Sequence, residues 1–153
     1  MTGKEYLWQY RTAYAELKRI ESEIASIEDL LGNVTVDPTA EHVQSSPDPD
    51  KIGKLVAKKI DMMSDLNEKK EAALDVMAEI CSVIEKVEEP DDRLILQLRY
   101  VKMLSWDAVG EELEGMRKYY CLDWMMKHHR RAIRKVEEIT NCLNKYKNPC
   151  GIV

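Results

Sequence analysis

Apolar residues recur every three or four positions along the first thirty residues of the chain. In residues 3–31 these positions are Leu7, Tyr10, Tyr14, Leu17, Ile20, Ile24, Ile27 and Leu31. That spacing places them on one face of a helix. Gly32 and Asn33 follow as a stop signal, because glycine adopts the left-handed conformation of a helix C-cap at little cost. The pattern predicts one long helix over 3–31.

A second apolar stripe predicts a helix over 51–88, with a spacing close to the 3.5-residue repeat of coiled coils. Its members are Ile52, Val56, Ile60, Met63, Leu66, Ala73, Met77, Ile80, Ile84 and Val87. Residues 32–50, which join the two helices, are polar and contain three prolines, so they predict a loop. Neither helix buries its stripe alone. We therefore expect residues 1–89 to form an antiparallel, coiled-coil-like helical hairpin, by itself or paired with a second copy.

Pro90 marks a boundary, because proline disfavours continuing the preceding helix and the aspartates after it can cap a new one. From there the pattern predicts helices over 91–103, 105–114 and 122–145, followed by a tail at 148–153. Runs with period-two alternation are missing, so no sheet is expected. The predicted fold is all-α, with a domain over 90–147 after the hairpin.

Composition supports a helical protein without cofactors. Of 153 residues, 44% are hydrophobic and 33% charged, with only 6 Gly and 5 Pro. The four cysteines form no C-x-x-C pair. The N-terminus lacks the apolar core of a signal peptide, and no stretch approaches the roughly 18 apolar residues of a membrane span. We expect a cytoplasmic location with free thiols and no membrane partner.

Charge is distributed unevenly between the two parts. Residues 1–90 carry 11 Lys and Arg against 19 Asp and Glu, a net charge of −8. Residues 91–153 carry 12 against 9, a net +3, and residues 117–135 hold seven basic residues against one acid, Asp123. A polyanionic partner would be attracted to the C-terminal part and repelled by the N-terminal part.

The C-terminal part has the pattern of a helix-turn-helix. Ser105 is a good N-cap and Asp107 suits the first turn of a short helix. Trp106, Val109 and Leu113 share one face of that helix, and Gly110 allows another helix to approach closely. A turn and a helix rich in Arg and Lys follow, which is the order of elements in a helix-turn-helix.

These residues resemble region 4 of sigma-70-type factors. The resemblance lies in Arg93–Tyr100, in Ser105–Val109, and in His129, Arg131, Ala132 and Val136 of the closing helix. The whole chain is similar to a family of small prophage regulators of Gram-positive bacteria, with the layout of the ArpU and RinA phage regulators. Val43–Ser46 followed by Asp48–Asp50 resembles that family's linker. The resemblance implies a sigma-like helix-turn-helix, transcriptional regulation of prophage genes, and double-stranded DNA and RNA polymerase as partners.

One segment departs from that pattern. In sigma region 4 the turn before the recognition helix is short, whereas Met116–Tyr120 looks like an insertion of a few residues. The cap of the last helix then falls on Cys121 or Asp123, and aspartate is the better cap. We expect a lengthened turn, with the last helix starting near Asp123.

Seven basic residues are the candidate DNA contacts. Lys127, Arg130 and Arg131 are expected in the major groove, because the arginine fork can meet two acceptors of guanine. Phosphate contacts are expected from Arg117, Lys118, Arg134 and Lys135. The competing interpretation is that these charges form an ordinary solvated helix surface.

Other functions have weaker signals. His128 and His129 are adjacent, so they point in different directions on a helix and do not predict a metal site. We find no phosphate-binding glycine loop, nucleophile elbow or catalytic triad, so we expect no enzyme, cofactor or metal. Two alternatives to DNA readout stay open: an adapter that binds RNA polymerase, and a structural phage assembly protein built on the hairpin.

Overall fold

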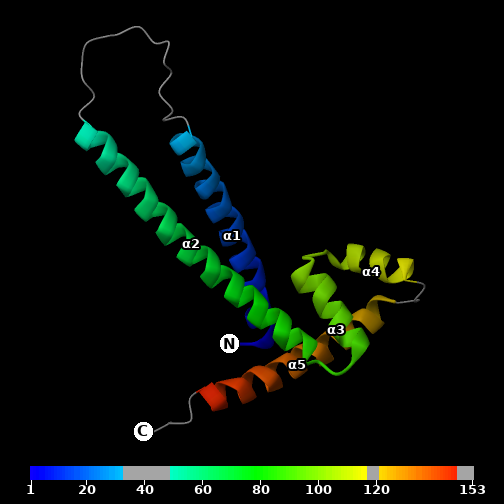
Figure 1. Cartoon of the computed structure of the whole chain (residues 1–153). Helices are drawn as coiled ribbons and strands as arrows, with labels where there is room; N and C mark the ends of the chain where they lie inside the picture. Colours follow the sequence, from blue (N-terminus) through cyan, green and yellow to red (C-terminus); the bar gives the residue numbers. More distant parts are fainter. Residues whose placement is uncertain (33–48, 117–120, 148–153) are drawn as a thin grey trace. The chain divides into compact units, whose positions relative to one another are not determined.

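The computed structural model describes residues 1–32, 49–116 and 121–147, and in this part of the chain it is all-helical. The helices are α1 (Gly3–Gly32), α2 (Pro49–Glu85), α3 (Pro90–Leu96), a π-helical segment η1 (Gln97–Val101), α4 (Trp106–Gly115) and α5 (Leu122–Lys147) (Figure 1). The all-α class predicted from the sequence is confirmed. Most of the predicted loop 32–50 and the tail 148–153 lie outside the described residues.

The chain divides into two compact units. The larger unit comprises Met1–Tyr14 and Asp75–Val153, and the smaller unit comprises Ala15–Leu74. Both α1 and α2 contribute residues to each unit. The domain boundary that the sequence suggests at residues 89 and 90 stays a prediction.

The smaller unit is held by a short apolar cluster between α1 and α2. Its buried members are Ile20, Ile27 and Leu66, and Ile24, Leu31 and Met63 pack against them. The Lys70 ammonium lies 3.8 Å from the Glu21 carboxylate across the same pair of helices. The expected burial of Ile60 in the apolar stripe of α2 is wrong, because this side chain is 56% exposed. Fewer residues of the stripe are therefore buried toward the N-terminal end of α2.

The larger unit has the main core. It draws buried residues from the start of α1, the end of α2, α3, η1 and α5: Tyr6, Leu7, Tyr10, Ile80, Val83, Ile84, Val87, Leu96, Tyr100, Ala132 and Val136. Tyr14, expected in the stripe, is instead exposed. Gly3 is buried where α1 meets α5, because a Cβ there would lie 2.8 Å from the Ile133 carbonyl oxygen. The first turns of α1 are thus part of the same packed body as α5.

A second cluster joins α4 to its neighbours in the larger unit. Leu98, Val109, Leu113 and Met125 are its buried members. The methyl end of Met125 is 3.8 Å from where a Cβ on Gly110 would be, so this glycine allows the close approach expected from the sequence. Leu98 belongs to η1 and Met125 to α5, so the cluster fixes α4 against both.

The segment expected as one helix over 91–103 has a different form. Its α-helical part ends at Leu96, and residues 97–101 form a π-helix, in which the Lys102 N–H donates to the Gln97 carbonyl at 2.9 Å. Met103 then takes a left-handed conformation with φ 58°. π-Helical turns are rare and concentrate at functional positions. This one carries Arg99 and Tyr100.

The starts of α4 and α5 are built as their sequences suggest. Ser105 is extended, and its hydroxyl accepts a hydrogen bond from the Ala108 N–H at 3.2 Å, which confirms it as the N-cap. α5 begins at Leu122, where the helix predicted over 122–145 begins, rather than at Asp123. The Cys121 carbonyl accepts the first helical bond, from the Met125 N–H at 3.1 Å.

Candidate nucleic-acid interface

α5 has one buried face and one basic face. Met125, Ala132 and Val136 are buried, while His129, Ile139 and Leu143 are partly buried against the same cores. At 100° per residue, positions 127, 130 and 134 fall on the opposite side of the helix. Lys127, Arg130 and Arg134 are indeed exposed. The apolar side predicted for this helix is therefore confirmed.

The seven basic residues singled out from the sequence do not form one set. Arg117 and Lys118 lie outside the described residues. Lys127, Arg130 and Arg134 form no ion pair with any residue in the described part of the chain. Arg131 and Lys135, on the flank of α5 that faces α3, are each paired with an acid.

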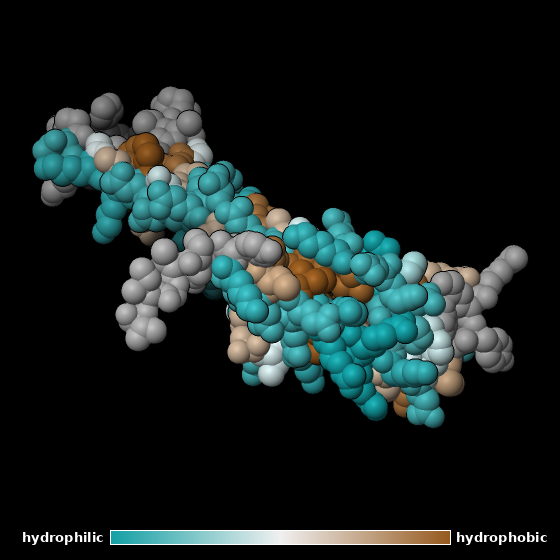
Figure 2. Space-filling view, turned by 90° about the horizontal axis from the view of Figure 1, so that it is seen from below, coloured by the Kyte–Doolittle hydropathy of each residue, from teal (hydrophilic) through white to brown (hydrophobic). Residues whose placement is uncertain are grey.

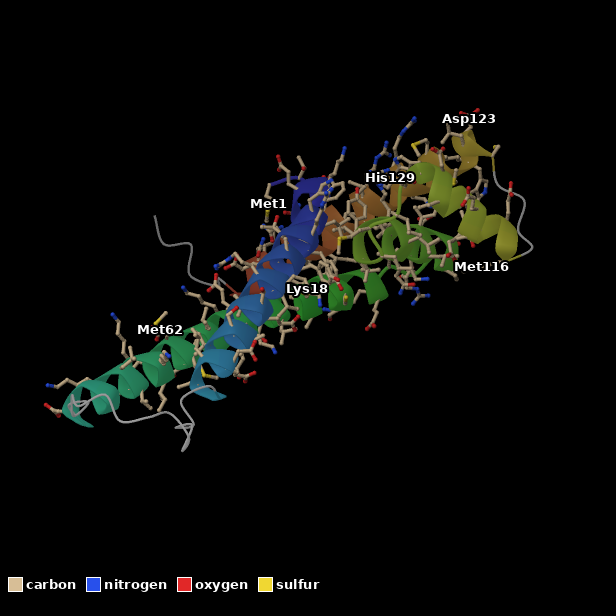
Figure 3. The ribbon with its side chains drawn as sticks, turned by 90° about the horizontal axis from the view of Figure 1, so that it is seen from above. Met1, Lys18, Met62, Met116, Asp123 and His129 are labelled. Atoms are coloured by element: carbon tan, nitrogen blue, oxygen red, sulfur yellow. The ribbon has the colours of Figure 1, made fainter. Side chains whose placement is uncertain are left out.

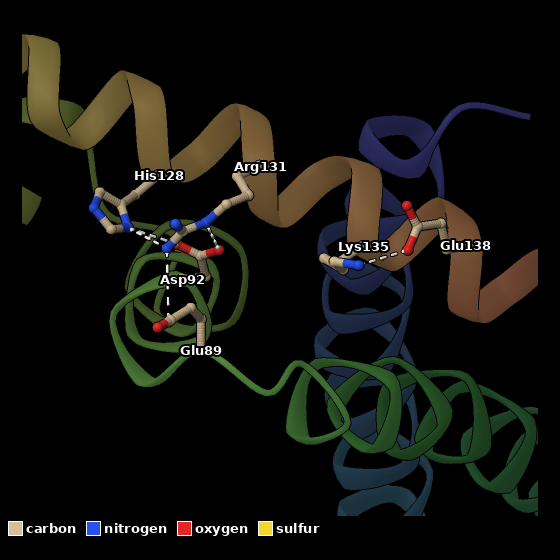
Figure 4. Close-up of polar contacts among 6 residues, drawn as sticks. All are labelled: Glu89, Asp92, His128, Arg131, Lys135 and Glu138. Atoms are coloured by element: carbon tan, nitrogen blue, oxygen red, sulfur yellow. Dashed lines mark hydrogen bonds and ion pairs between the residues drawn. The ribbon is translucent and has the colours of Figure 1, made fainter.

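Arg131 is held by a buried carboxylate of α3 (Figure 4). Its Nε and one terminal nitrogen donate to the two oxygens of Asp92 at 2.6 and 2.9 Å. The His128 Nδ1 is 2.6 Å from the same carboxylate, and Asp92 is only 1% exposed. Glu89 adds an ion pair to Arg131 at 3.8 Å. A bidentate arginine–carboxylate pair of this kind fixes geometry as well as charge, so this guanidinium joins α3 to α5.

Lys135 makes a simpler contact. Its ammonium lies 2.8 Å from the Glu138 carboxylate, one turn further along α5, and both side chains are more than half exposed (Figure 4). An exposed pair of this kind is worth little and exchanges readily with another anion. Lys135 is therefore partly neutralised but still accessible.

His129 lies at the centre of an aromatic cluster on the other flank of α5. Its Nε2 is 2.9 Å from the Tyr100 hydroxyl, and its ring stacks on Tyr100 and meets Trp106 edge-on at 4.9 Å. Burial lowers the pKa of His129 to about 4, helped by the positive charges of Lys4, Arg99 and Arg130, and burial raises the pKa of Tyr100 to about 12. Both rings are therefore neutral at pH 7 and share one hydrogen bond.

Arg99 is fixed between two tryptophans. Its guanidinium carbon is 5.4 Å from the centre of the Trp8 ring and 5.2 Å from that of Trp106. One terminal nitrogen donates to the Leu104 carbonyl at 2.5 Å. Cation–π contacts of this geometry are worth about 0.5–1 kcal/mol at exposed sites and more when water is excluded. Trp8 comes from α1 and Trp106 from α4, so Arg99 joins three elements.

Sequence reasoning missed the roles of Asp92, Arg99 and Trp8. The only available signal for Asp92 was its position after Pro90, which suggested a helix cap rather than a partner for α5. Trp8 lies in the helix predicted over 3–31 but outside its apolar stripe, so the pattern gave it no partner. Nothing in the sequence indicated that the first turns of α1 would lie against the basic helix.

α4 is acidic, in contrast to α5. It carries no basic residue, and its four acids are all exposed: Asp107, Glu111, Glu112 and Glu114. A polyanion that meets α5 would therefore be repelled from the solvent face of α4.

Metal, membrane and redox chemistry receive no support from the described residues. No group of three or more His, Cys, Asp or Glu side chains is arranged to hold a metal ion among residues 1–32, 49–116 and 121–147. Within the same ranges every helix falls short of the length and apolar character that a membrane crossing requires. Cys81, Cys121 and Cys142 are free thiols.

Comparisons with known proteins give no relative for this chain. No family model, no curated protein and no solved structure matches it.

Proposed function

We propose that this protein is a DNA-binding transcription regulator, in which α3, α4 and α5 form a sigma region 4-like helix-turn-helix. The observation that carries the proposal is the basic face of α5. Lys127, Arg130 and Arg134 project from one side of a helix whose other side is buried, and no acid in the described residues neutralises them. An exposed helix of this charge suits the major groove of DNA.

The ion pairs refine the roles given to the predicted residues. We assign base contacts to Lys127 and Arg130 and a phosphate contact to Arg134. Arg131, first expected in the groove, is assigned a positioning role because Asp92 holds its guanidinium. Lys135 keeps a phosphate role, since its partner is an exposed glutamate. Arg117 and Lys118 stay predicted phosphate contacts in the turn.

Selection of bound sequences from a random duplex pool, followed by fluorescence anisotropy on the selected duplex, tests this function. The double variant Arg130→Gln/Arg134→Gln should weaken binding through a lost base contact and lower the slope of log affinity against log salt by about 0.9, for the one lost phosphate contact. The matched control Lys86→Gln/Lys102→Gln removes the same charge from exposed positions outside both proposed interfaces and should bind as the wild type does. Absence of binding, or equal loss in both variants, would overturn the proposal.

A second candidate is an adapter that binds RNA polymerase without reading DNA. The acidic face of α4 favours it, together with the exposed apolar residues Met116 and Leu122 on either side of the turn. Co-purification of polymerase with a chain that shifts no duplex would select this function. Loss of the polymerase in Glu111→Gln/Glu112→Gln would assign it to α4.

The proposal includes an antiparallel hairpin of α1 and α2 that pairs with a second copy. In the smaller unit Leu55 is 53% and Met62 47% exposed. A groove of about 510 Å³ lies there, lined by Ile27, Met62 and Leu66 among others. Figure 2 shows a hydrophobic patch beside the grey residues at the end where α1 stops and α2 begins.

Charge favours a second copy as the occupant of that groove. Residues 21–29 carry four acids and no base, whereas residues 50–59 carry four lysines and one acid. In a two-fold pair with both hairpins pointing the same way, α1 of one copy would lie beside α2 of the other. Light scattering should then give a dimer for the wild type and a monomer for Leu55→Lys/Met62→Lys.

A further inference from the structure

Four basic side chains gather in the larger unit on the flank of α5 opposite Asp92. They come from three elements: Lys4 and Arg11 from α1, Arg99 from η1 and Arg130 from α5. The guanidinium carbons of Arg11 and Arg99 lie 5.6 and 5.4 Å from the centre of the same Trp8 ring. The charges of Lys4, Arg99 and Arg130 all act on the His129 imidazole. Figure 3 shows nitrogen-bearing side chains gathered around His129 beside the first turns of α1.

These four cations have no ion-pair partner in the described residues. Two carboxylates of α1 and α5 are hydrogen-bonded to the backbone at the start of α1: Glu5 accepts from the Thr2 N–H at 2.8 Å, and Glu137 accepts from the Gly3 N–H at 2.8 Å. Lys4, Arg11 and Arg130 are exposed, and Arg99 is half-buried.

Gathering like charges without a counter-ion costs free energy, and here the packing holds them in place. Trp8 and Trp106 fix Arg99, and the Leu104 carbonyl occupies one of its nitrogens. The partly buried His129 has its pKa lowered to about 4, so its ring is neutral at pH 7 and adds no further positive charge. Fixed arginine forks and flexible lysines arranged in this way are how proteins bind phosphate oxygens.

The cluster is continuous with the basic face of α5. Arg130 is part of both the basic face and the cluster. It lies on α5 one turn before Ile133, and the Ile133 carbonyl packs against Gly3 at the start of α1. On the other flank of α5, the charge of Arg131 is neutralised by Asp92 of α3 and by Glu89, the residue before that helix. The unneutralised surface therefore extends from α5 toward the start of α1.

We propose that Lys4, Arg11 and Arg99, which lie beside the base-contacting Arg130, bind backbone phosphates of double-stranded DNA, so that the first turns of α1 form part of the nucleic-acid interface. The proposal rests on the function proposed above and adds to it. It adds to Arg99 two phosphate-binding residues of α1, Lys4 and Arg11, which lie outside the helix-turn-helix and some ninety residues earlier in the sequence. The DNA would lie across α5 and the N-terminal turns of α1.

The test compares duplex affinity in the full-length chain at 0.1 and 0.2 M salt. Lys4→Gln/Arg11→Gln should weaken binding at 0.15 M salt by about 30-fold and lower the slope of log affinity against log salt by about 1.8, at about 0.9 per phosphate contact. Lys86→Gln/Lys102→Gln is the charge-matched control and should leave affinity within about twofold. Lys4→Arg/Arg11→Lys keeps both charges and should retain the wild-type slope of log affinity against log salt, although Arg11→Lys loses the guanidinium contact with Trp8.

The wild type and the variants test the helix-turn-helix assignment and the α1 surface separately. If the wild type binds DNA and Arg130→Gln/Arg134→Gln weakens it, but Lys4→Gln/Arg11→Gln binds as the control does, the α1 surface is refuted and the helix-turn-helix assignment stands. If the wild type binds no duplex, both proposals fall. A helical circular dichroism spectrum and an unchanged melting temperature show that the variant is folded, so that weakened binding reports lost contacts.

Discussion

Asp92 is the residue through which α3 holds α5, and Asp92→Asn removes its charge with little change of shape. The carboxylate accepts three hydrogen bonds, two from Arg131 and one from His128, and is almost fully buried. The amide of asparagine accepts through one oxygen only, and its NH₂ group would face the donors of the guanidinium. The substitution therefore breaks the Asp92–Arg131 ion pair by removing the charge of its buried partner.

The expected loss follows from these contacts. Removing one partner of a buried, charged pair costs about 3–5 kcal/mol, and single hydrogen bonds to charged groups about 1.5–3 kcal/mol. Arg131 is 47% exposed and recovers part of its hydration. We expect a loss of about 2–4 kcal/mol in the free energy of unfolding of the larger unit. For a chain of this size the melting temperature should fall by about 5–12 °C.

Thermal and urea unfolding followed by circular dichroism measure this loss. The matched control is Glu138→Gln, which breaks the exposed pair with Lys135 on the same helix and should leave the midpoint unchanged because water screens that pair. If Asp92→Asn shifts the midpoint no more than Glu138→Gln does, then Asp92 does not hold α5, and the positioning role assigned to Arg131 is wrong.

Three further perturbations test the packing. Gly3→Ala places a Cβ 2.8 Å from the Ile133 carbonyl oxygen and should lower the free energy of unfolding in urea by about 1–3 kcal/mol. Its control is Gly53→Ala on α2, where a Cβ meets open space and should stabilise the protein by up to about 1 kcal/mol. Equal effects of the two substitutions would contradict the close approach of α1 and α5. Ser105→Ala removes the N-cap of α4 and should cost about 1 kcal/mol, with Ser105→Asp close to wild type. Because the folded pKa of His129 is lowered to about 4 from 6.5, the unfolded chain takes up its proton first, so this residue's contribution to stability is complete above pH 6.5 and is lost as the pH falls toward 4. NMR titration of the ring should give a pKa near 4, and a ring that titrates near 6.5 would refute its burial among cations.

The helices themselves could be read from the sequence, because their signals are local. Apolar spacing predicted most helix ends to within three residues. Ser105 indicated the start of α4, because a serine side chain is a good N-cap. The face of α5 that would be buried followed from the same periodicity. The exception is η1, since the π-helical turn depends on how Leu98 and Tyr100 pack rather than on any residue pattern.

The candidate site was predictable only in part, because charge partners are not local. Arg131 and Arg130 are neighbours in the sequence and look alike, yet one is paired with an aspartate 39 residues earlier and the other is not. Lys4 and Arg11 gave no signal, since their relevance depends on where α1 packs. The exposed Tyr14 and Ile60 show the same limit for the core. An apolar stripe predicts which face of a helix can be buried, but not how much of that face a neighbouring helix covers.

The salt dependence of duplex binding tests the central claim most directly. Anisotropy of a selected duplex, measured from 0.05 to 0.3 M salt with the wild-type chain, should give a slope of log affinity against log salt of about −6, because each of the proposed phosphate contacts (Lys4, Arg11, Arg99, Arg117, Lys118, Arg134 and Lys135) contributes about 0.9. A slope near zero, or no binding at the lowest salt, would contradict the assignment of this protein as a DNA-binding regulator.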